Sequence, residues 1–317
     1  MSEKSKQRML AASAALARRF HEGADTLCMA ILDMLVFLCA ESPSEALRTH
    51  PDFLAGKSTY PKRKNAEAFL AYAHKQWFHH KSSKMRVLVE DKPTKGWLAP
   101  YRVTFYADDL TGLLPDQVFG LLEVLPLTRL ILVELALDFS PLSTVDRTFV
   151  RWHGYFGRSQ RDRFTKNEEG DWWGARNGGK RVKSYLKSGE ECGHRVEFRV
   201  RRRFLENYGV TDIYDFRRFV DILPHRHIRF AQFDQQRLRN HLAKKGFNAA
   251  RTRKTLQQVA EMGADLSATL KYLRDDVGLH NVTRFLVPLP ENQLVTEALS
   301  KWAASWPSAP SRLMQSK

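Results

Sequence analysis

The sequence predicts an α+β protein built on a central, mostly antiparallel sheet with helical regions at both ends. Short runs with two-residue apolar alternation lie between residues 85 and 204, which is the pattern of strands. The flanking segments have helical apolar spacing, and 43% hydrophobic residues in a chain of 317 can supply a core. We therefore expect a helical N-terminal region at 1–80, a sheet domain at 81–222 and a helical C-terminal region at 223–317.

The N-terminal region is expected to contain three helices. Residues 6–40 predict two of them, broken at the sequence HEGAD, where a glycine can end one helix and an aspartate can cap the next. The apolar run at 27–40 is too short to span a bilayer and contains Asp33, so we expect a buried helix there. A third helix is predicted at 66–78, and the start of the chain lacks the pattern of a signal peptide.

The sheet domain is interrupted by one predicted helix, PDQVFGLLEVL, which begins with proline. A hairpin is expected from RVKSYLK and HRVEFRVR, and antiparallel pairing of this kind favours α+β over a parallel doubly wound sheet. In the C-terminal region, Gly246, Gly263 and Gly278 each follow a helical pattern and are expected to end it.

The charge of the chain points to an anionic partner. Lys and Arg number 51 against 35 acidic residues, a formal net charge of +16. Residues 147–206 hold sixteen Lys and Arg and eight Asp and Glu, so half of the excess lies in about a fifth of the chain. Such a concentration on one predicted sheet favours a nucleic-acid-binding surface over an evenly solvated basic face. Three widely spaced cysteines form neither a disulfide framework nor a zinc pattern, which fits a reducing cytoplasm.

The predicted hairpin at 180–204 places one tyrosine on its charged side. In HRVEFRVR, alternate residues form an apolar face of Val196, Phe198 and Val200. If the apolar faces of the two strands match, Tyr185 lies outside the core on the opposite face. Its expected neighbours there are Lys183, Lys187, Arg195, Glu197 and Arg199.

Two acidic residues interrupt an apolar strand. In LILVELALDF, Glu134 and Asp138 share a face, and burying them is costly unless they are paired or bound to metal. With Glu197 from the hairpin they offer the oxygen ligands that Mg²⁺ or Mn²⁺ prefers. The alternative is that these acids pair with neighbouring arginines and that Tyr185 is an ordinary strand tyrosine.

The order LVELALDF, WWGARNGGKRVKSYLK and HRVEFRV resembles that of the replication initiation factor family, the Rep proteins of rolling-circle plasmids and some phages. The resemblance covers roughly residues 85–220. It implies that Tyr185 is the nucleophile, that Lys187 and Arg195 assist catalysis, and that the metal ligands are Glu134, Asp138 and Glu197. The residues expected to contact nucleic acid are Arg176, Lys180, Arg181, Lys183, Arg199 and Arg201.

The activity implied by the resemblance is nicking and rejoining of origin DNA. Attack by the tyrosine would leave a 5′-phosphotyrosine link and a 3′-hydroxyl for a host polymerase. A phenol with an ordinary pKa of about 10 is a weak nucleophile, and nearby cations or a divalent metal favour its phenolate. The expected partners are origin DNA, single-stranded or extruded, with flanking duplex, and host replication proteins; a homodimer is plausible.

Two other functions remain open from the sequence. One is a sequence-specific DNA- or RNA-binding protein without catalysis, which would share the salt-sensitive binding but not the need for Tyr185 and metal. The other is a membrane-surface protein, which is weaker because no predicted helix combines a basic face with a broad apolar one. Trp172 and Trp173 are expected on opposite faces of their strand, so that either one ring stacks on an unpaired base or both belong to the core. The helices after residue 232 are compatible with a helix-turn-helix that reads DNA and equally with ordinary helix packing.

Overall fold

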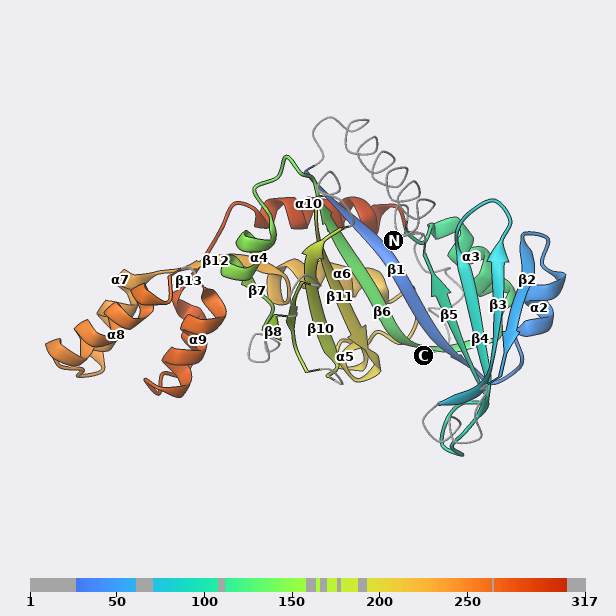
Figure 1. Cartoon of the computed structure of the whole chain (residues 1–317), viewed down its shortest axis with the longest axis horizontal. Helices are drawn as coiled ribbons and strands as arrows, with labels where there is room; N and C mark the ends of the chain where they lie inside the picture. The colour runs from blue at the N-terminus through green and yellow to red at the C-terminus, as the bar shows by residue number, and fades with distance from the viewer. Residues whose placement is uncertain are drawn as a thin grey trace, which may run out of the picture. The chain divides into compact units, whose positions relative to one another are not determined.

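The protein has an α+β fold in which a long antiparallel sheet is combined with helices (Figure 1). The computed structural model describes residues 27–60, 71–107, 112–157, 164–165, 170–175, 178–187, 193–263 and 265–306. Within these residues the large sheet has the strand order β2-β3-β4-β5-β1-β6-β11-β10-β9-β8, and a smaller sheet has the order β13-β12-β7. The predicted α+β class is therefore confirmed.

Contacts between residues divide the chain into two compact units. The first consists of Met1–Met29, Leu137–Val196 and Val220–Ser300. The second consists of Ala30–Ala136, Glu197–Phe219 and Lys301–Lys317. Strands β1, β6 and β11 each contain residues of both units, so each unit is assembled from segments far apart in the sequence.

The helix predicted at 27–40 is wrong, because Cys28–Cys39 forms the strand β1. It pairs antiparallel with β5 (Tyr101–Tyr106), with Met34 opposite Tyr106 and Cys39 opposite Tyr101. An unbroken apolar run fits a central strand covered on both faces as well as it fits a buried helix. The segment forms a strand because β5 and β6 lie on its two sides in the sheet and can bond to its backbone.

The helix predicted at 66–78 is also wrong over its described part, where Tyr72–His80 forms β3. Alternate residues from Tyr72 to Phe78 are buried, but two of the four are polar. One of these, His74, is bonded to Asp91 at 2.8 Å and to Ser58 at 2.6 Å. Polar residues on the buried face hide the two-residue apolar period that marks a strand.

The remaining strands and helices of the second unit complete an antiparallel meander. The strands β2 (Phe53–Thr59), β3, β4 (Arg86–Pro93) and β5 pair in sequence order. The predicted helix after them is confirmed as α3 (Pro115–Val124), which begins at a proline. Short helices α2 (Ser44–Thr49) and α5 (Arg202–Glu206) accompany them.

In the first unit, short strands follow the long strand β6. Strand β6 spans Leu127–Phe139, and α4 (Arg147–His153) begins at Asp146, whose carboxylate accepts a hydrogen bond from the Phe149 amide at 2.7 Å. The strands that follow are β7 (Gly154–Tyr155), β8 (Phe164–Thr165), β9 (Asp171–Trp173), β10 (Lys180–Leu186) and β11 (His194–Arg201).

The helices predicted toward the C-terminal end are confirmed, and a small sheet that the sequence did not indicate lies among them. Its helices are α6 (Phe216–Arg226), α7 (Gln235–Lys244), α8 (Ala249–Glu261), α9 (Leu266–Asp275) and α10 (Asn292–Ala304). Strands β12 (Arg229–Phe233) and β13 (Leu286–Pro288) pair with each other, and β12 also pairs with β7. The glycines expected to end helices, Gly246, Gly263 and Gly278, all have positive φ.

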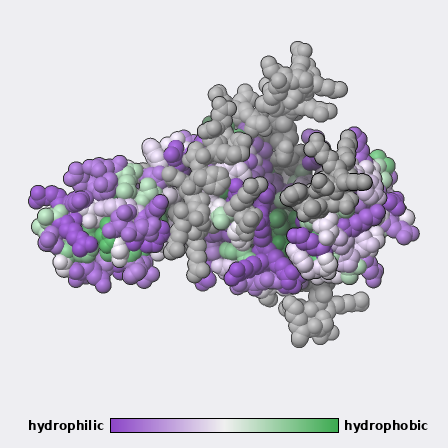
Figure 2. All heavy atoms as spheres, turned by 60° about the horizontal axis from the view of Figure 1, so that its bottom comes forward, coloured by the Kyte–Doolittle hydropathy of each residue, from purple (hydrophilic) through white to green (hydrophobic). Residues whose placement is uncertain are grey.

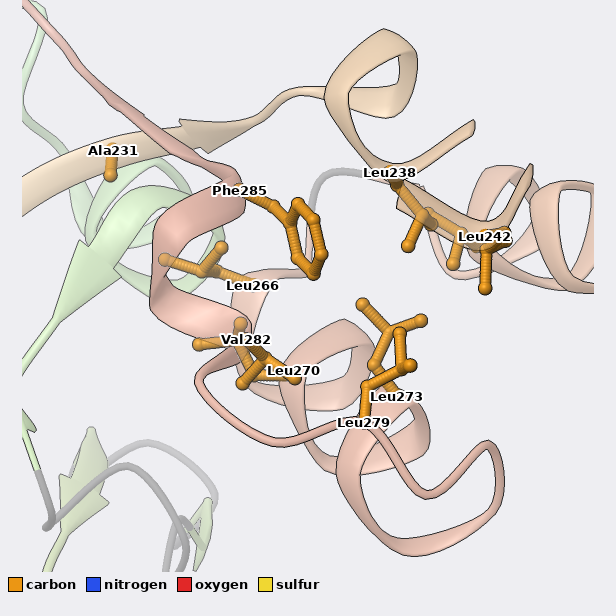
Figure 3. Packing of buried hydrophobic residues seen from close by; sticks show 10 residues of the cluster. Ala231, Leu238, Leu242, Leu266, Leu270, Leu273, Leu279, Val282 and Phe285 are labelled. Atoms are coloured by element: carbon orange, nitrogen blue, oxygen red, sulfur yellow. The ribbon is translucent and has the colours of Figure 1, made fainter. Parts of the chain in front are cut away.

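Helices α7 to α9 have a hydrophobic core of their own (Figure 3). Leu238 and Leu242 of α7 point toward Phe285 and Leu273, and all four side chains are buried. Hydrophilic atoms cover most of the outer surface of these helices, at the left of the space-filling view (Figure 2). None of the helices in the described residues is long and apolar enough to span a bilayer.

Candidate metal centre and tyrosine strand

The two faces of β11 are divided as predicted from Val196 onward, whereas Arg195, which was expected on the charged face, is buried. Val196, Phe198 and Val200 are each about 1% exposed and face the core. The intervening residues Glu197, Arg199 and Arg201 are partly exposed on the other face. The apolar alternation therefore identified the charged face of this strand correctly.

Asp138 is held in a buried ion cluster. Arg195 donates two hydrogen bonds to its carboxylate, from Nε to Oδ1 at 2.5 Å and from Nη2 to Oδ2 at 2.7 Å, and Lys187 Nζ donates to Oδ2 at 3.1 Å. All three side chains are almost fully buried. Burial alone would raise the pKa of Asp138, but the two cations outweigh it and hold the pKa below its usual range.

This arrangement places three of the predicted site residues together in the interior. Asp138 is paired with two cations, and Lys187 and Arg195 are buried with it. Spacing explains why Asp138 cannot share an ion with Glu134. Four residues along a strand cover roughly 13 Å, whereas two oxygen ligands on opposite sides of Mg²⁺ lie about 4.2 Å apart.

A different set of carboxylates converges in the second unit. Asp33 of β1, Glu134 of β6 and Glu197 of β11 come from three strands that follow one another in the sheet order. One carboxylate oxygen from each residue lies within 4.8 Å of the others. Glu134 is buried, and Asp33 and Glu197 are half-buried. Two of the three predicted acidic ligands are therefore brought together, with Asp33 in place of Asp138.

Arg199 belongs to the same cluster. Its Nε donates a short hydrogen bond to Glu134 Oε2. Burial alone would lower the pKa of Arg199, but the hydrogen bond and charge of Glu134, together with the charge of Glu197, raise it above its ordinary value. Arg199, expected to bind nucleic acid, thus lies against the acids and offsets one of their charges.

The acidic cluster fits a hard divalent cation. Carboxylate oxygens are the preferred ligands of Mg²⁺ and Mn²⁺. The span of 4.8 Å between ligand atoms exceeds the roughly 4.2 Å of opposite magnesium ligands by an amount that a small side-chain rotation can close. Among the described residues that form the cluster, three carboxylates and one guanidinium leave a double negative charge, which one divalent ion balances.

The sequence contained a signal for Asp33 that our interpretation did not use. Asp33 stands inside a run of twelve residues that is otherwise apolar. In a strand of this kind a carboxylate is costly to bury unless it is paired with a cation or bound to a metal, as is also true of Glu134. The run was interpreted as a helix, and so its acid was not combined with those of the other strands.

Tyr185 lies in a row of cations and aromatic rings in the first unit. It is half-buried on β10, and Lys183 Nζ lies 3.7 Å from the centre of its ring. Lys183 is paired across the sheet with Trp172, and its Nζ is 5.2 Å from that ring. The guanidinium carbon of Arg181 lies 3.9 Å from the same ring. These contacts place positive charge beside the tyrosine, as its charged strand predicts.

The chain passes close behind Tyr185. Gly170 has φ of 114°, and a Cβ at this position would collide with the backbone of Ser184 and approach Cβ of Tyr185 to 2.8 Å. Only glycine fits such a conformation and such a close approach. The backbone beside the tyrosine is therefore restricted by its neighbour strand.

The two tryptophans of β9 lie on opposite faces, as expected. Trp173 is fully buried and donates from Nε1 to Ser267 Oγ at 3.4 Å, so it belongs to the core. Trp172 is half-buried and carries Arg181 and Lys183 against its ring. It is the member of the pair that lies on the charged face.

The remaining basic residues have different environments. Lys180 is 8% exposed, donates to the Phe156 carbonyl at 2.6 Å and lies 3.2 Å from His227 Nδ1. Burial lowers the pKa of Lys180 to about 7, so this expected DNA contact is instead an interior group. Arg201 is half-exposed in the second unit. Arg176 lies outside the described residues.

One residue of β10 departs from the predicted faces. Leu186 was expected on the apolar side with Val182 and Ser184, and it is 51% exposed. Val182 and Ser184 are fully buried, and Ser184 Oγ lies 2.6 Å from His194 Nε2. The alternation fails at Leu186 because β10 ends there, and the next residue, Lys187, turns inward to Asp138.

The geometry is the basis for assigning a function to this chain. A comparison with models of known protein families and a comparison with curated proteins both give no match.

Proposed function

We propose that the protein initiates rolling-circle replication by nicking and rejoining origin DNA through Tyr185 with a divalent metal ion. The observation that carries the proposal is the convergence of Asp33, Glu134 and Glu197 from three successive strands of the sheet. Strand β10, which carries Tyr185, is the next strand after β11 in the same order. A cluster of carboxylates that can hold a divalent ion and a strand tyrosine beside cations are the two parts that the predicted chemistry requires.

The tyrosine would act as a nucleophile on phosphorus. Its oxygen forms a bond to the scissile phosphorus as the phenolic proton leaves to solvent, and the bond from phosphorus to the 3′ oxygen breaks. The 3′ oxygen takes up a proton and becomes a free hydroxyl, and the 5′ phosphate stays on Tyr185. The positive charge of Lys183, 3.7 Å from the ring centre, favours the phenolate form that attacks.

The acids and the ion cluster have separate roles in this proposal. Asp33, Glu134 and Glu197 would hold Mg²⁺ or Mn²⁺, which when bound supplies polarisation of a phosphate oxygen and stabilises charge on a leaving oxygen. Asp138, with Arg195 and Lys187, is a positioning element. Lys187 follows Tyr185 by two residues, and its buried contact with Asp138 fastens the end of the tyrosine strand.

The partners follow from the reaction. Origin DNA would be taken in single-stranded or extruded form, with flanking duplex, and host replication proteins would extend the 3′-hydroxyl. A homodimer is compatible with a two-part origin. The basic excess of the chain, a formal charge of +16, favours association with DNA of any sequence as the first step.

A second candidate is a DNA- or RNA-binding protein without catalysis. The observation that favours it is the burial of Lys187 and Arg195 against Asp138. The family resemblance assigns both of these residues to catalysis. In addition, Tyr185 is half-buried with Lys183 above its ring. Such a protein would bind DNA with strong salt dependence and would need neither the tyrosine hydroxyl nor the ion.

The test is a search for a covalent adduct. Supercoiled plasmid that carries the origin of the element encoding this chain, and labelled single strands from it, are incubated with protein and Mn²⁺. Adducts are then resolved on a denaturing gel. We expect wild type to form an adduct and Tyr185→Phe to form none while its DNA binding persists. Tyr208→Phe, at another half-buried tyrosine, is the matched control and should behave as wild type.

Two results would decide against the enzyme. An adduct that persists in Tyr185→Phe would mean that another residue is the nucleophile. The absence of any adduct on origin DNA, with salt-sensitive binding intact, would leave the non-catalytic binding protein. Omitting Mn²⁺ and adding a chelator should abolish nicking in wild type.

A further inference from the structure

A cavity of about 580 Å³ opens on the sheet of the second unit. Residues of β1, β3, β4, β5 and β6 line it, together with the loop that joins β4 to β5. Among the residues that the structure describes, all those that line it belong to this unit. The volume lies within the range of pockets that hold small ligands, and it is sufficient for one nucleotide.

The lining combines apolar, aromatic and basic groups. Apolar contacts come from Met34, Val36 and Leu88, and rings come from Tyr72 and Tyr106. A flat base can be placed against such a surface because every base has two apolar faces.

The charge of the lining is positive. The charged residues that line the cavity are Lys75, Glu90, Arg102, Arg201 and Arg202. The only carboxylate among them, Glu90, is already bound by Lys75 at 3.2 Å and by Arg102 at 2.5 Å. Arg202 also contacts Glu206 at 2.9 Å, at the exposed surface. The net charge therefore favours an anionic ligand.

Trp97 stands at the rim with 77% of its surface exposed. An exposed ring of this size offers a face on which an unpaired base can stack. The loop that carries it is fastened, because the hydroxyl of Tyr72 donates to the Ala99 carbonyl at 3.0 Å and the amide of Leu98 donates to the Lys95 carbonyl at 3.1 Å. Lys95 Nζ lies 5.7 Å from the ring centre, where a phosphate could reach it. The ring is thus exposed on a loop whose backbone is held in place.

We propose that this cavity binds an unpaired nucleotide of single-stranded nucleic acid, with its base stacked on Trp97 and a neighbouring phosphate near Arg201. This inference rests on the proposed function, since an initiator must hold the strand that it nicks, and it names the residues that would grip that strand. The complementary charge of the lining and the fixed, exposed ring select this ligand over an apolar peptide, which would not require four basic residues.

Binding of labelled oligonucleotides tests the proposal. Fluorescence anisotropy is measured with oligo-dT, oligo-U and a duplex of equal length, at a fixed salt concentration and without metal, so that no strand is cleaved. Trp97→Ala should weaken oligo-dT binding by roughly 5- to 150-fold, the value of one base stack, and change duplex binding by less than about twofold. Oligo-U shows whether RNA is held as well.

Matched variants keep the result specific. Trp152→Ala removes another exposed tryptophan, 44% exposed on α4, and should leave oligo-dT binding unchanged. Trp97→Phe should restore most of the affinity, because a smaller ring can still stack. Arg201→Gln should lower the slope of log affinity against log salt by about 0.7. The circular dichroism of each variant checks its fold.

The proposal is overturned if Trp97→Ala binds oligo-dT within twofold of wild type, or if single-strand and duplex binding fall together. Failure of this inference can be told from failure of the proposed function. Wild type that forms a Tyr185 adduct while Trp97→Ala binds normally rejects only the cavity. Wild type that needs Trp97 for binding but never forms an adduct rejects only the nicking activity.

Discussion

Arg195 and Asp138 form a two-pronged ion pair in the interior, with Nε–Oδ1 at 2.5 Å and Nη2–Oδ2 at 2.7 Å. Arg195 is 2% exposed and Asp138 is 1% exposed, so water screens the pair very little. Lys187 adds a second cation to the same carboxylate. The acid that the family resemblance assigns to metal binding therefore acts as a structural anchor between β6, β11 and the end of β10.

Removing the charge of Asp138 should destabilise the fold. Asp138→Asn removes the buried carboxylate charge that Arg195 and Lys187 share, and breaking a buried ion pair in this way costs roughly 3 to 5 kcal/mol. Urea denaturation followed by circular dichroism measures the loss. Glu206→Gln, which breaks ion pairs at an exposed site, should cost far less, because water screens such pairs. An Asp138→Asn variant as stable as wild type would contradict the anchoring role.

Metal binding should depend on the acidic cluster of the second unit. Glu197→Gln and Asp33→Asn each remove a carboxylate ligand and should weaken Mn²⁺ binding by about 10-fold or more. Calorimetric titration gives the affinity, and the rise in melting temperature with excess Mn²⁺ gives an independent measure. Glu206→Gln is the control acid of the same unit. Equal Mn²⁺ affinity in all variants would place the ion elsewhere.

Stability should fall between pH 6.5 and pH 4 because of His194. Burial lowers the pKa of His194 to about 4, with a further lowering by Arg147 and opposing effects of Asp146 and Asp171. The neutral form is thus favoured in the folded state. Its contribution is complete above the unfolded pKa of about 6.5 and is lost as pH falls through the folded pKa.

The size of this effect can be measured by denaturation at pH 7.5 and pH 4.5. The shift corresponds to roughly 3 kcal/mol at most. In His194→Gln, which removes the titrating ring and can still bond to Ser184, the loss on acidification should be smaller. His227, whose pKa burial lowers to about 3, titrates in the same interval and remains in both proteins. An identical loss in both proteins would exclude His194 as a source.

Two lysines of β10 should differ in their effect on DNA binding. Lys183 lies on the charged face beside Tyr185, so Lys183→Gln should lower the slope of log affinity against log salt by about 0.7 to 0.9. Lys180 is buried against the Phe156 carbonyl and His227, so Lys180→Met should leave the slope unchanged. Filter binding over a salt series checks both. A reduced slope in Lys180→Met would show that this side chain reaches a phosphate.

Local patterns were sufficient for much of the fold. The alternation of Val196, Phe198 and Val200 determines which face of β11 is buried, because neighbouring side chains of a strand point to opposite sides. The helices at the C-terminal end, and their glycine stops such as Gly246, follow from apolar spacing and from a conformation that favours glycine. In each case the determining residues lie within a few positions of one another.

Other features depend on partners that are distant in the sequence. The segment Cys28–Cys39 is apolar enough for either a helix or a strand, and β5 and β6 on its two sides decide for the strand. The segment Tyr72–His80 buries polar side chains, and their partners Ser58 and Asp91 lie on other strands. The strand propensity of the residues within a segment contains no information about partners on other strands.

The sequence by itself determined the α+β class, the charged face that carries Tyr185 and the presence of acids that require cations. Only the tertiary structure decided which cation each acid receives. Asp138 is paired with Arg195 and Lys187, whereas Glu134 is paired with Arg199 and lies beside Asp33 and Glu197. The physical reason is distance: a strand separates residues four apart by roughly 13 Å, while pairing brings residues a hundred positions apart into contact.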